Sequence, residues 1–217
     1  GTGLTSATMT VTIEKGSMGG RSYTATWTPT AYAISYTLNG GTVTGNPTNY
    51  TIESDAITLN NPTRAGYTFA GWNTQADGKG TDYSDGQEVQ NLTSDADGEI
   101  TLYAKWTAIT YSIGYELDGG ELQEGQVNPT SYTADSDDII LNAPTKTGYA
   151  FTGWNGTDLA EATLTLTIPS GSYGNRSYTA TWTSITYTIS YDLGGGTLPD
   201  GYRVSYYVES GTFTLPD

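Results

Sequence analysis

The sequence predicts a mainly β protein, β-rich α+β at most, built from tandem repeats of about 76–79 residues. Three observations carry this prediction. The same aromatic segments recur along the 217-residue chain. Within them apolar and polar residues alternate, which is the two-residue period of a β-strand. No long window shows apolar residues at the spacing of a helix, and β-branched residues are abundant.

The five tryptophans mark the repeat. Trp27, Trp106 and Trp182 close the segments RSYTATWT, ITLYAKWT and RSYTATWT, while Trp72 and Trp154 lie in RAGYTFAGWN and KTGYAFTGWN. Disordered acidic chains lack such regularly placed aromatic residues. Residues 1–28 align without gaps on residues 156–183, so the chain reads as a window cut from a longer array. The predicted domains are the end of one repeat at 1–28, complete repeats at 29–107 and 108–183, and the start of another at 184–217.

Each repeat opens with an alternating segment that ends in glycines. It reads YAISYTLNGG at 32–41, YSIGYELDGG at 111–120 and YTISYDLGGG at 187–196. One face of this segment is apolar, and the glycines supply positive φ for a chain reversal. We expect a half-buried strand followed by a turn, with the strand paired to the closing Trp segment of its repeat or lying near it.

Further strands are expected along the rest of each repeat. A second strand is expected near 48–52 and 131–134, and a third ends at a proline in AITLNNPT and IILNAPT. The GY-x-F-x-GW segment alternates again, and its glycine lets the indole that follows lie across a neighbouring backbone. The last strand carries LYAKW or YTATW.

The recurrent aromatic residues are the predicted core, because they keep to the apolar phase of each strand. Each ring can bury of the order of 150–250 Å². A sugar-stacking platform is the alternative interpretation of the same rings. The predicted core residues are Trp27, Trp72, Trp106, Trp154, Trp182, Tyr36, Tyr67, Phe69, Tyr115, Tyr149, Phe151 and Tyr191.

The composition excludes several classes of function. The chain has no Cys and no His, which removes disulfides, thiol nucleophiles, imidazole bases and the commonest ligands of zinc, copper and haem. A formal net charge of −15 argues against nucleic acids, and no apolar run approaches the roughly 20 residues of a membrane helix. We expect no cofactor, no membrane insertion in this segment and no enzyme, although composition alone permits a glycosidase-type carboxylate pair.

Two weaker site candidates remain. Asp95, Asp97 and Glu99 in SDADGE resemble part of a calcium loop, but neither this stretch nor 75–86 completes the pattern of alternating ligands. An acidic solvated turn is the favoured interpretation. Lys105 is the only lysine in a core-like strand, so it is the candidate for a self-made Lys–Asn cross-link, but it falls on the polar phase of that strand.

The ordered blocks Y-x-I-x-Y-x-L-x-G-G, P-T-[RK]-x-G-Y-x-F-x-G-W and L-Y-A-K-W resemble the Listeria–Bacteroides repeat, a family that includes the B repeat of internalin B. The resemblance is fullest over 32–106 and covers nearly the whole chain. It implies small β-grasp or ubiquitin-like domains in tandem, without catalytic residues, in secreted and surface proteins of bacteria.

Taken together, these features predict a non-catalytic stalk or spacer of an adhesin-type bacterial protein, extracellular and either secreted or at the cell surface. Short linkers between repeats suggest beads on a semi-rigid rod. One alternative is a repeat module that binds a host protein or glycan. Another is a self-assembling fibre element whose two ends complete one bead. The expected partners are neighbouring repeats of the same protein, with a host ligand or head-to-tail self-association as alternatives.

Overall fold

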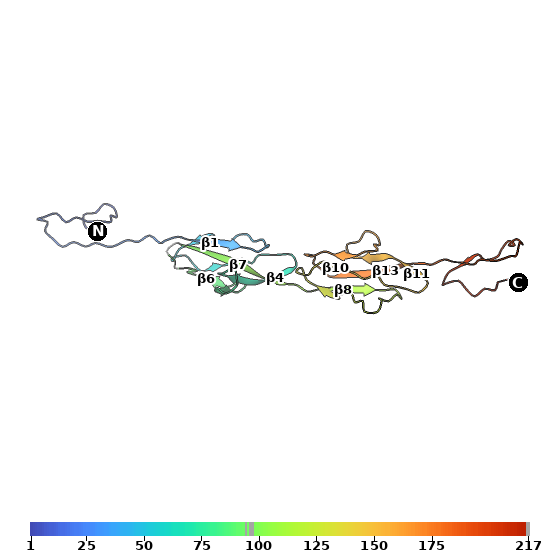
Figure 1. Cartoon of the computed structure of the whole chain (residues 1–217). Helices are drawn as coiled ribbons and strands as arrows, with labels where there is room; N and C mark the ends of the chain where they lie inside the picture. The colour runs from blue at the N-terminus through green and yellow to red at the C-terminus, as the bar shows by residue number, and fades with distance from the viewer. Residues whose placement is uncertain (94, 96–97, 216–217) are drawn as a thin grey trace. The chain divides into compact units, whose positions relative to one another are not determined.

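The computed structural model describes residues 1–93, 95 and 98–215, and these residues form strands and turns without a helix (Figure 1). The prediction of a mainly β chain is therefore confirmed. Over the same residues, no helical segment has the length and apolarity needed to cross a membrane. Two compact units divide the chain: one joins 1–62 to 70–105, and the other joins 63–69 to 106–217.

The first unit holds most of a five-stranded sheet with the strand order β2-β1-β7-β4-β5. Its first strand, β1, runs parallel to its last long strand, β7, with Ala33 opposite Glu99 and Thr37 opposite Tyr103. A separate antiparallel ladder joins β3 to β6. The strands are β1 (Tyr32–Thr37), β2 (Asn49–Tyr50), β3 (Ile57–Thr58), β4 (Tyr67–Asn73), β5 (Asp82–Tyr83), β6 (Glu88–Val89) and β7 (Glu99–Ala108).

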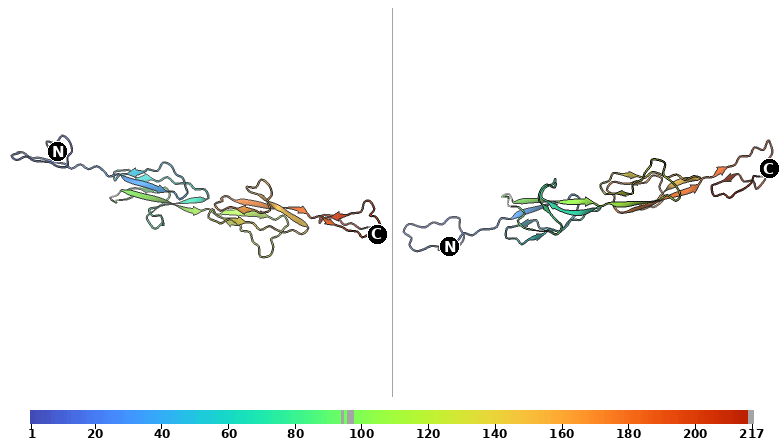
Figure 2. Two further views of the ribbon diagram at one scale, coloured as in Figure 1. Left: turned by 45° about the horizontal axis from the view of Figure 1, so that its top comes forward. Right: turned by 90° about the horizontal axis from the view of Figure 1, so that it is seen from below.

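The second unit repeats this plan in a four-stranded sheet with the order β11-β13-β8-β9 (Figure 2). Its opening strand β8 again runs parallel to the closing strand β13, with Ile113 opposite Arg176 and Glu116 opposite Thr179. The prediction that the opening strand pairs with the closing segment is confirmed in both sheets. The strands are β8 (Tyr111–Glu116), β9 (Ser131–Tyr132), β10 (Ile139–Ile140), β11 (Tyr149–Gly156), β12 (Thr167–Ile168) and β13 (Arg176–Ser184).

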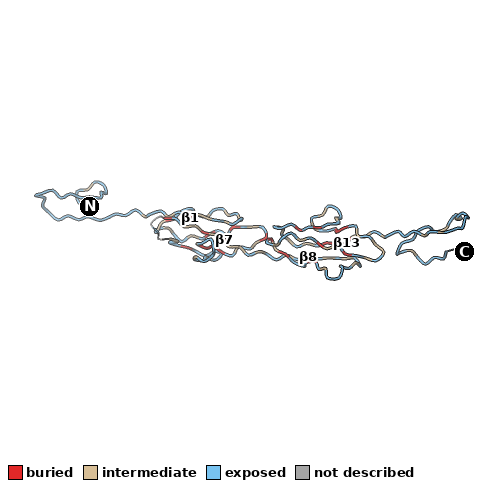
Figure 3. Tube along the Cα trace, viewed as in Figure 1, coloured by how far each residue is buried: buried red, intermediate tan, exposed pale blue. Residues whose placement is uncertain are grey.

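Each sheet buries the tryptophan of its Gly-Trp pair. Trp72 is 1% exposed and Trp154 is 0% exposed, because the apolar phase of β4 and β11 faces the core. Figure 3 shows buried residues along both sheets and exposed residues along the first part of the chain. Around Trp154 the core consists of Ile113, Tyr132, Leu141, Leu166, Ile168, Tyr178 and Ala180.

The glycine before each buried tryptophan is required by a close backbone approach. Gly71 has a φ of 110°, and a Cβ there would lie 2.6 Å from the Tyr83 carbonyl oxygen. Gly153 has a φ of 136°, and a Cβ there would lie 2.7 Å from the Thr163 backbone. Only glycine tolerates both the positive φ and the contact. The glycine before each indole therefore lies against a neighbouring backbone.

The two ends of the chain form less strand than predicted. No strand lies within 1–28, and the opening segment at 187–196 is reduced to β14 (Tyr187–Thr188), paired with β15 (Ser205–Tyr206). The expected long strand there is wrong for this structure. β1 and β8 each lie between an antiparallel neighbour and a parallel closing strand, whereas β14 pairs with β15 alone among the described residues. The ladder is therefore too narrow to bury a face.

Candidate functional site

The predicted core aromatics occupy three kinds of environment. Trp72 and Trp154 are buried, whereas Trp27 is 90% exposed, so the prediction that Trp27 is a core residue is wrong here. The physical reason is that residues 21–28 form no strand, while Trp106 and Trp182 lie in β7 and β13. The half-buried residues are Tyr36, Tyr67, Phe69, Trp106, Tyr115, Tyr149, Phe151, Trp182 and Tyr191.

Most of these rings contact one another. Trp154 lies edge-on to Phe151, whose ring centroid is 5.7 Å away, and Phe151 in turn lies 5.5 Å from Trp182 in the same arrangement. Trp72 lies edge-on to Tyr36 at 5.4 Å, and Trp154 makes the corresponding contact with Tyr115 at 6.1 Å. Edge-to-face pairs of this kind add to the stability gained by burial. The rings are thus engaged in packing, which leaves few flat faces for a sugar.

Two equivalent tyrosines on the opening strands bind the chain just before the second strand of each repeat, β2 or β9. The Tyr36 hydroxyl donates to the Pro47 carbonyl at 2.8 Å, and the Tyr115 hydroxyl donates to the Pro129 carbonyl. Burial disfavours the phenolate and raises the pKa of each tyrosine to about 12. Both hydroxyls are therefore structural donors across the physiological range.

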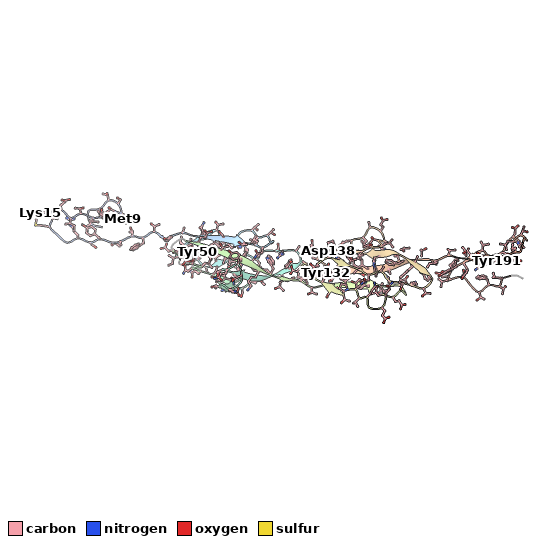
Figure 4. All side chains as sticks on the ribbon, viewed as in Figure 1. Met9, Lys15, Tyr50, Tyr132, Asp138 and Tyr191 are labelled. Carbon is pink, nitrogen blue, oxygen red and sulfur yellow. The ribbon has the colours of Figure 1, made fainter. Side chains whose placement is uncertain are left out.

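A second tyrosine pair occupies the neighbouring strand. Tyr50 and Tyr132, both labelled in Figure 4, lie opposite the first tyrosine of each opening strand. The Tyr132 hydroxyl accepts from Arg176 Nε at 2.8 Å and donates to the Gly174 carbonyl at 2.6 Å. Arg176 also binds Asp158 at 2.7 Å, and its side chain is only 10% exposed. This arginine was missed in the sequence, although the recurrence of its RSYTATWT segment was a signal for it.

An open cleft of about 290 Å³ lies beside Trp182. The Trp182 indole donates to the Leu117 carbonyl at 3.1 Å and covers Gly120, where a Cβ would lie 2.4 Å from the ring. Lys146 Nζ lies 4.4 Å from the Tyr149 ring centroid at the edge of the cleft. The lining residues are Glu121, Pro144, Thr145, Lys146, Thr147, Tyr149, Phe151 and Trp182.

Lys105 lies beside an asparagine and a carboxylate, the set that a Lys–Asn cross-link requires. Lys105 Nζ donates to Asp82 Oδ1 at 2.8 Å, and Asn73 Nδ2 donates to the same oxygen at 2.7 Å. These two hydrogen bonds hold the pKa of the Asp82 carboxyl below its usual range, and the bond from Lys105 has the larger effect. Asn73 is fully buried and also binds Gly80, so the trio acts as a structural clamp.

The structure describes two of the three residues of the calcium candidate, Asp95 and Glu99. Asp97 lies outside the described residues. Glu99 accepts a hydrogen bond from the Ser35 hydroxyl at 3.0 Å, and the Asp95 carbonyl accepts one from the Gly98 amide at 3.0 Å. Among residues 1–93, 95 and 98–215, no three acidic side chains gather where they could hold a metal ion.

The arrangement defines a class of protein: two small all-β repeats in tandem, each folded around a Gly-Trp pair and a parallel pair of first and last strands. More particularly, residues 32–105 match the Listeria–Bacteroides repeat domain, and residues 115–186 match the divergent InlB B-repeat domain. The chain thus carries these two repeat domains in tandem, which confirms the resemblance in the sequence. Both are non-catalytic repeat domains.

Three relatives show where such repeats occur. The chain is 32% identical over 141 residues to a protein of Evansella cellulosilytica described as a Gly-rich membrane protein, and 28% identical over 176 residues to a second membrane protein of that organism. It is 34% identical over 94 residues to internalin H of Listeria monocytogenes. These stretches cover 65%, 79% and 43% of this chain but only 15%, 24% and 15% of the relatives. No solved structure matches the chain.

Proposed function

We propose that this chain is a non-catalytic, tension-bearing spacer within a bacterial cell-surface protein. The relatives support the surface location, because they include an internalin and proteins described as membrane proteins. The repeats support the spacer role, because their recurrent aromatics and glycines are used in packing and in close backbone approaches. In a repeat array, length and stability grow with the number of repeats.

One observation carries the mechanical part of this proposal: the first and last long strands of each repeat are adjacent and parallel. A pull on the two ends of a repeat acts on the start of β1 and the end of β7, or on the start of β8 and the end of β13. In parallel neighbours this load runs along the strands and shears all their hydrogen bonds together. An antiparallel pair of terminal strands would instead be unzipped one bond at a time.

The same pairing leads us to propose a β-grasp relationship for each repeat. In the β-grasp fold the first and last strands of the domain lie side by side and parallel. The order β2-β1-β7-β4 in one sheet and β9-β8-β13-β11 in the other has this feature. Over the part of each repeat that the structure describes, loops and short ladders stand where the β-grasp fold has its helix. We propose that each β-grasp domain spans one complete repeat, 29–107 or 108–183.

Small-angle X-ray scattering tests the spacer role. The 217-residue chain is compared with longer chains in which residues 29–183 are duplicated once and twice. We expect the maximum dimension to grow by a constant increment with each duplication, because each repeat contributes its own length. A maximum dimension that stays nearly constant as repeats are added would contradict the proposal.

The cleft beside Trp182 supports a second candidate, the binding of a glycan or a host protein. It combines aromatic rings with Lys146 and Glu121, which suits a neutral or weakly polar ligand. Its volume of about 290 Å³ lies at the small end of ligand sites. Glycan-array binding by the chain, lost in Trp182→Ala, would favour this role. The absence of any saturable ligand would leave the spacer role alone.

A further inference from the structure

The Gly-Tyr segment just before each buried tryptophan makes a set of contacts of its own. Gly66 and Tyr67 belong to the second compact unit, where they lie on the turn that ends β9. The Tyr67 hydroxyl donates to the Asp135 carboxylate. A Cβ at Gly66 would lie 2.9 Å from the Ala134 Cβ, so glycine is required for this approach. Gly66 is buried, and Ala134 is only 8% exposed.

The same contacts recur at the next Gly-Tyr segment. The Tyr149 hydroxyl forms a hydrogen bond with the Glu209 carboxylate. A Cβ at Gly148 would lie 2.7 Å from the Val208 Cβ. Ser184 strengthens the contact, because its hydroxyl also donates to Glu209 at 2.9 Å. The pairing is therefore a property of the repeat, since two different pairs of segments form it.

A backbone hydrogen bond and a cation complete each contact. The Ile109 amide donates to the Gly66 carbonyl at 2.9 Å, and the Ile185 amide donates to the Gly148 carbonyl at the same distance. A cation lies three residues before each tyrosine: the Arg64 guanidinium is 3.6 Å from the ring centroid of Tyr67, and Lys146 is 4.4 Å from that of Tyr149. Such a cation stabilises the ring and favours an acidic partner.

The receiving turn has one geometry in every copy. In 133–136 the first amide donates to the Ser136 hydroxyl at 3.0 Å, and the Ser136 amide donates back to the first carbonyl at 3.1 Å. In 207–210 the same two bonds measure 3.0 and 2.9 Å. Each turn presents an apolar residue and then an acid: Ala134 and Asp135, or Val208 and Glu209.

The first repeat has the same turn at 51–54, but no Gly-Tyr segment of the described residues contacts it. In Thr51–Ser54 the two bonds measure 2.9 and 3.0 Å, and the presented residues are Ile52 and Glu53. Ile52 is 67% exposed, whereas at the occupied turns Ala134 is 8% exposed and Val208 is 49% exposed. Among the described residues, the Glu53 carboxylate binds no donor, in contrast to Asp135 and Glu209.

We infer that the Thr51–Ser54 turn is a docking site for the Gly-Tyr segment of another repeat of this family. The occupant must have a glycine to admit Ile52, a tyrosine to bind the Glu53 carboxylate, and an arginine or lysine three residues before that tyrosine. The two occupied turns at 133–136 and 207–210 show how this site is filled. The inference concerns recognition between repeats, and it does not depend on whether they bear tension.

The direct test adds a repeat whose Gly-Tyr segment can reach the Thr51–Ser54 turn. Residues 108–155 are added before Gly1, which completes a repeat because residues 1–28 align on 156–183. The accessibility of the Ile52 methyls is followed by NMR with a soluble gadolinium chelate. We expect the paramagnetic relaxation at the Ile52 methyls to fall to that of the Val208 methyls at the occupied turn when the segment is added. It should stay at its original value when, in the added copy, the tyrosine is replaced by alanine and the glycine by aspartate. An unchanged Ile52 beside a folded added repeat would overturn the inference.

A second experiment applies whether or not the added repeat folds. In the 217-residue chain, Val208→Asp places a second negative charge at an occupied turn, and Ile52→Asp makes the matched change at the open one. We expect Val208→Asp to speed hydrogen exchange of the Ile185 amide about tenfold or more, because its partner Gly148 is displaced. Ile52→Asp should leave the exchange of the Ile109 and Ile185 amides unchanged. If Val208→Asp does not affect Ile185, the Gly-Tyr segment does not recognise the turn.

Discussion

Gly153 provides the sharpest test of the packing of a repeat. Its φ is 136°, and a Cβ there would lie 2.7 Å from the backbone nitrogen and carbon of Thr163. Thr163 cannot move away freely, because it exchanges two hydrogen bonds with Trp154 at 2.8 and 2.9 Å. In Gly153→Ala the positive φ costs about 1–2 kcal/mol, and the collision adds about 1–3 kcal/mol. We therefore expect a loss of about 2–5 kcal/mol from the free energy of unfolding.

Gly171 is the matched control within the same repeat. Its φ is also positive, at 79°, but no atom lies within 4 Å of the Cβ position. Gly171→Ala should cost only the conformational part, about 1–2 kcal/mol. Urea unfolding followed through the Trp154 indole N–H cross-peak reports on this repeat alone. Equal urea midpoints for Gly153→Ala and Gly171→Ala would contradict the conclusion that the Thr163 backbone excludes a side chain at residue 153.

Three further predictions follow from the same contacts. Gly120→Ala should destabilise the second repeat by about 1–3 kcal/mol, measured by urea unfolding, because the Cβ would lie 2.4 Å from the Trp182 ring. Burial raises the pKa of Tyr115 from 10.0 to about 12, so its contribution to the free energy of unfolding is complete below pH 10 and is lost as the pH rises to about 12. Phenolate absorbance during a pH titration, with Tyr115→Phe as the control, measures this ionisation. Arg176→Met should cost about 1.5–3 kcal/mol in thermal unfolding, because the charge-assisted bonds of a nearly buried guanidinium disappear, whereas Asp158→Asn should cost less than about 1 kcal/mol, since Asp158 is 73% exposed. A larger effect at Asp158 than at Arg176 would contradict this order.

Local patterns in the sequence were enough to predict the main features of each sheet. The alternation in 32–37 and 111–116 is a short-range property of a half-buried strand, so β1 and β8 could be expected. The glycines before Trp72 and Trp154 could be interpreted because a small residue beside a large ring implies a close backbone approach. Repetition supplied the rest, since two copies of one pattern confirm each other.

Contacts between polar residues far apart in sequence could not be predicted in this way. Asp82 and Lys105 lie 23 residues apart, and both fall on the polar phase, where a solvated role is the usual one. The acid of the receiving turn, Asp135, lies 68 residues from Tyr67. The sequence context of Trp27 predicts a core residue, yet a tryptophan is buried only where its strand has neighbours, and Trp27 is 90% exposed.

The central claim is that the parallel pair of first and last strands resists tension. The chain has no cysteine, so handles for an optical trap can be placed at will. Pulling through Thr110→Cys and Thr186→Cys loads β8 and β13 along their length, while pulling through Thr110→Cys and Tyr173→Cys loads the same pair from one end. We expect the unfolding force in the first geometry to be several-fold higher, because the hydrogen bonds must break together. Equal forces in the two geometries would contradict the claim.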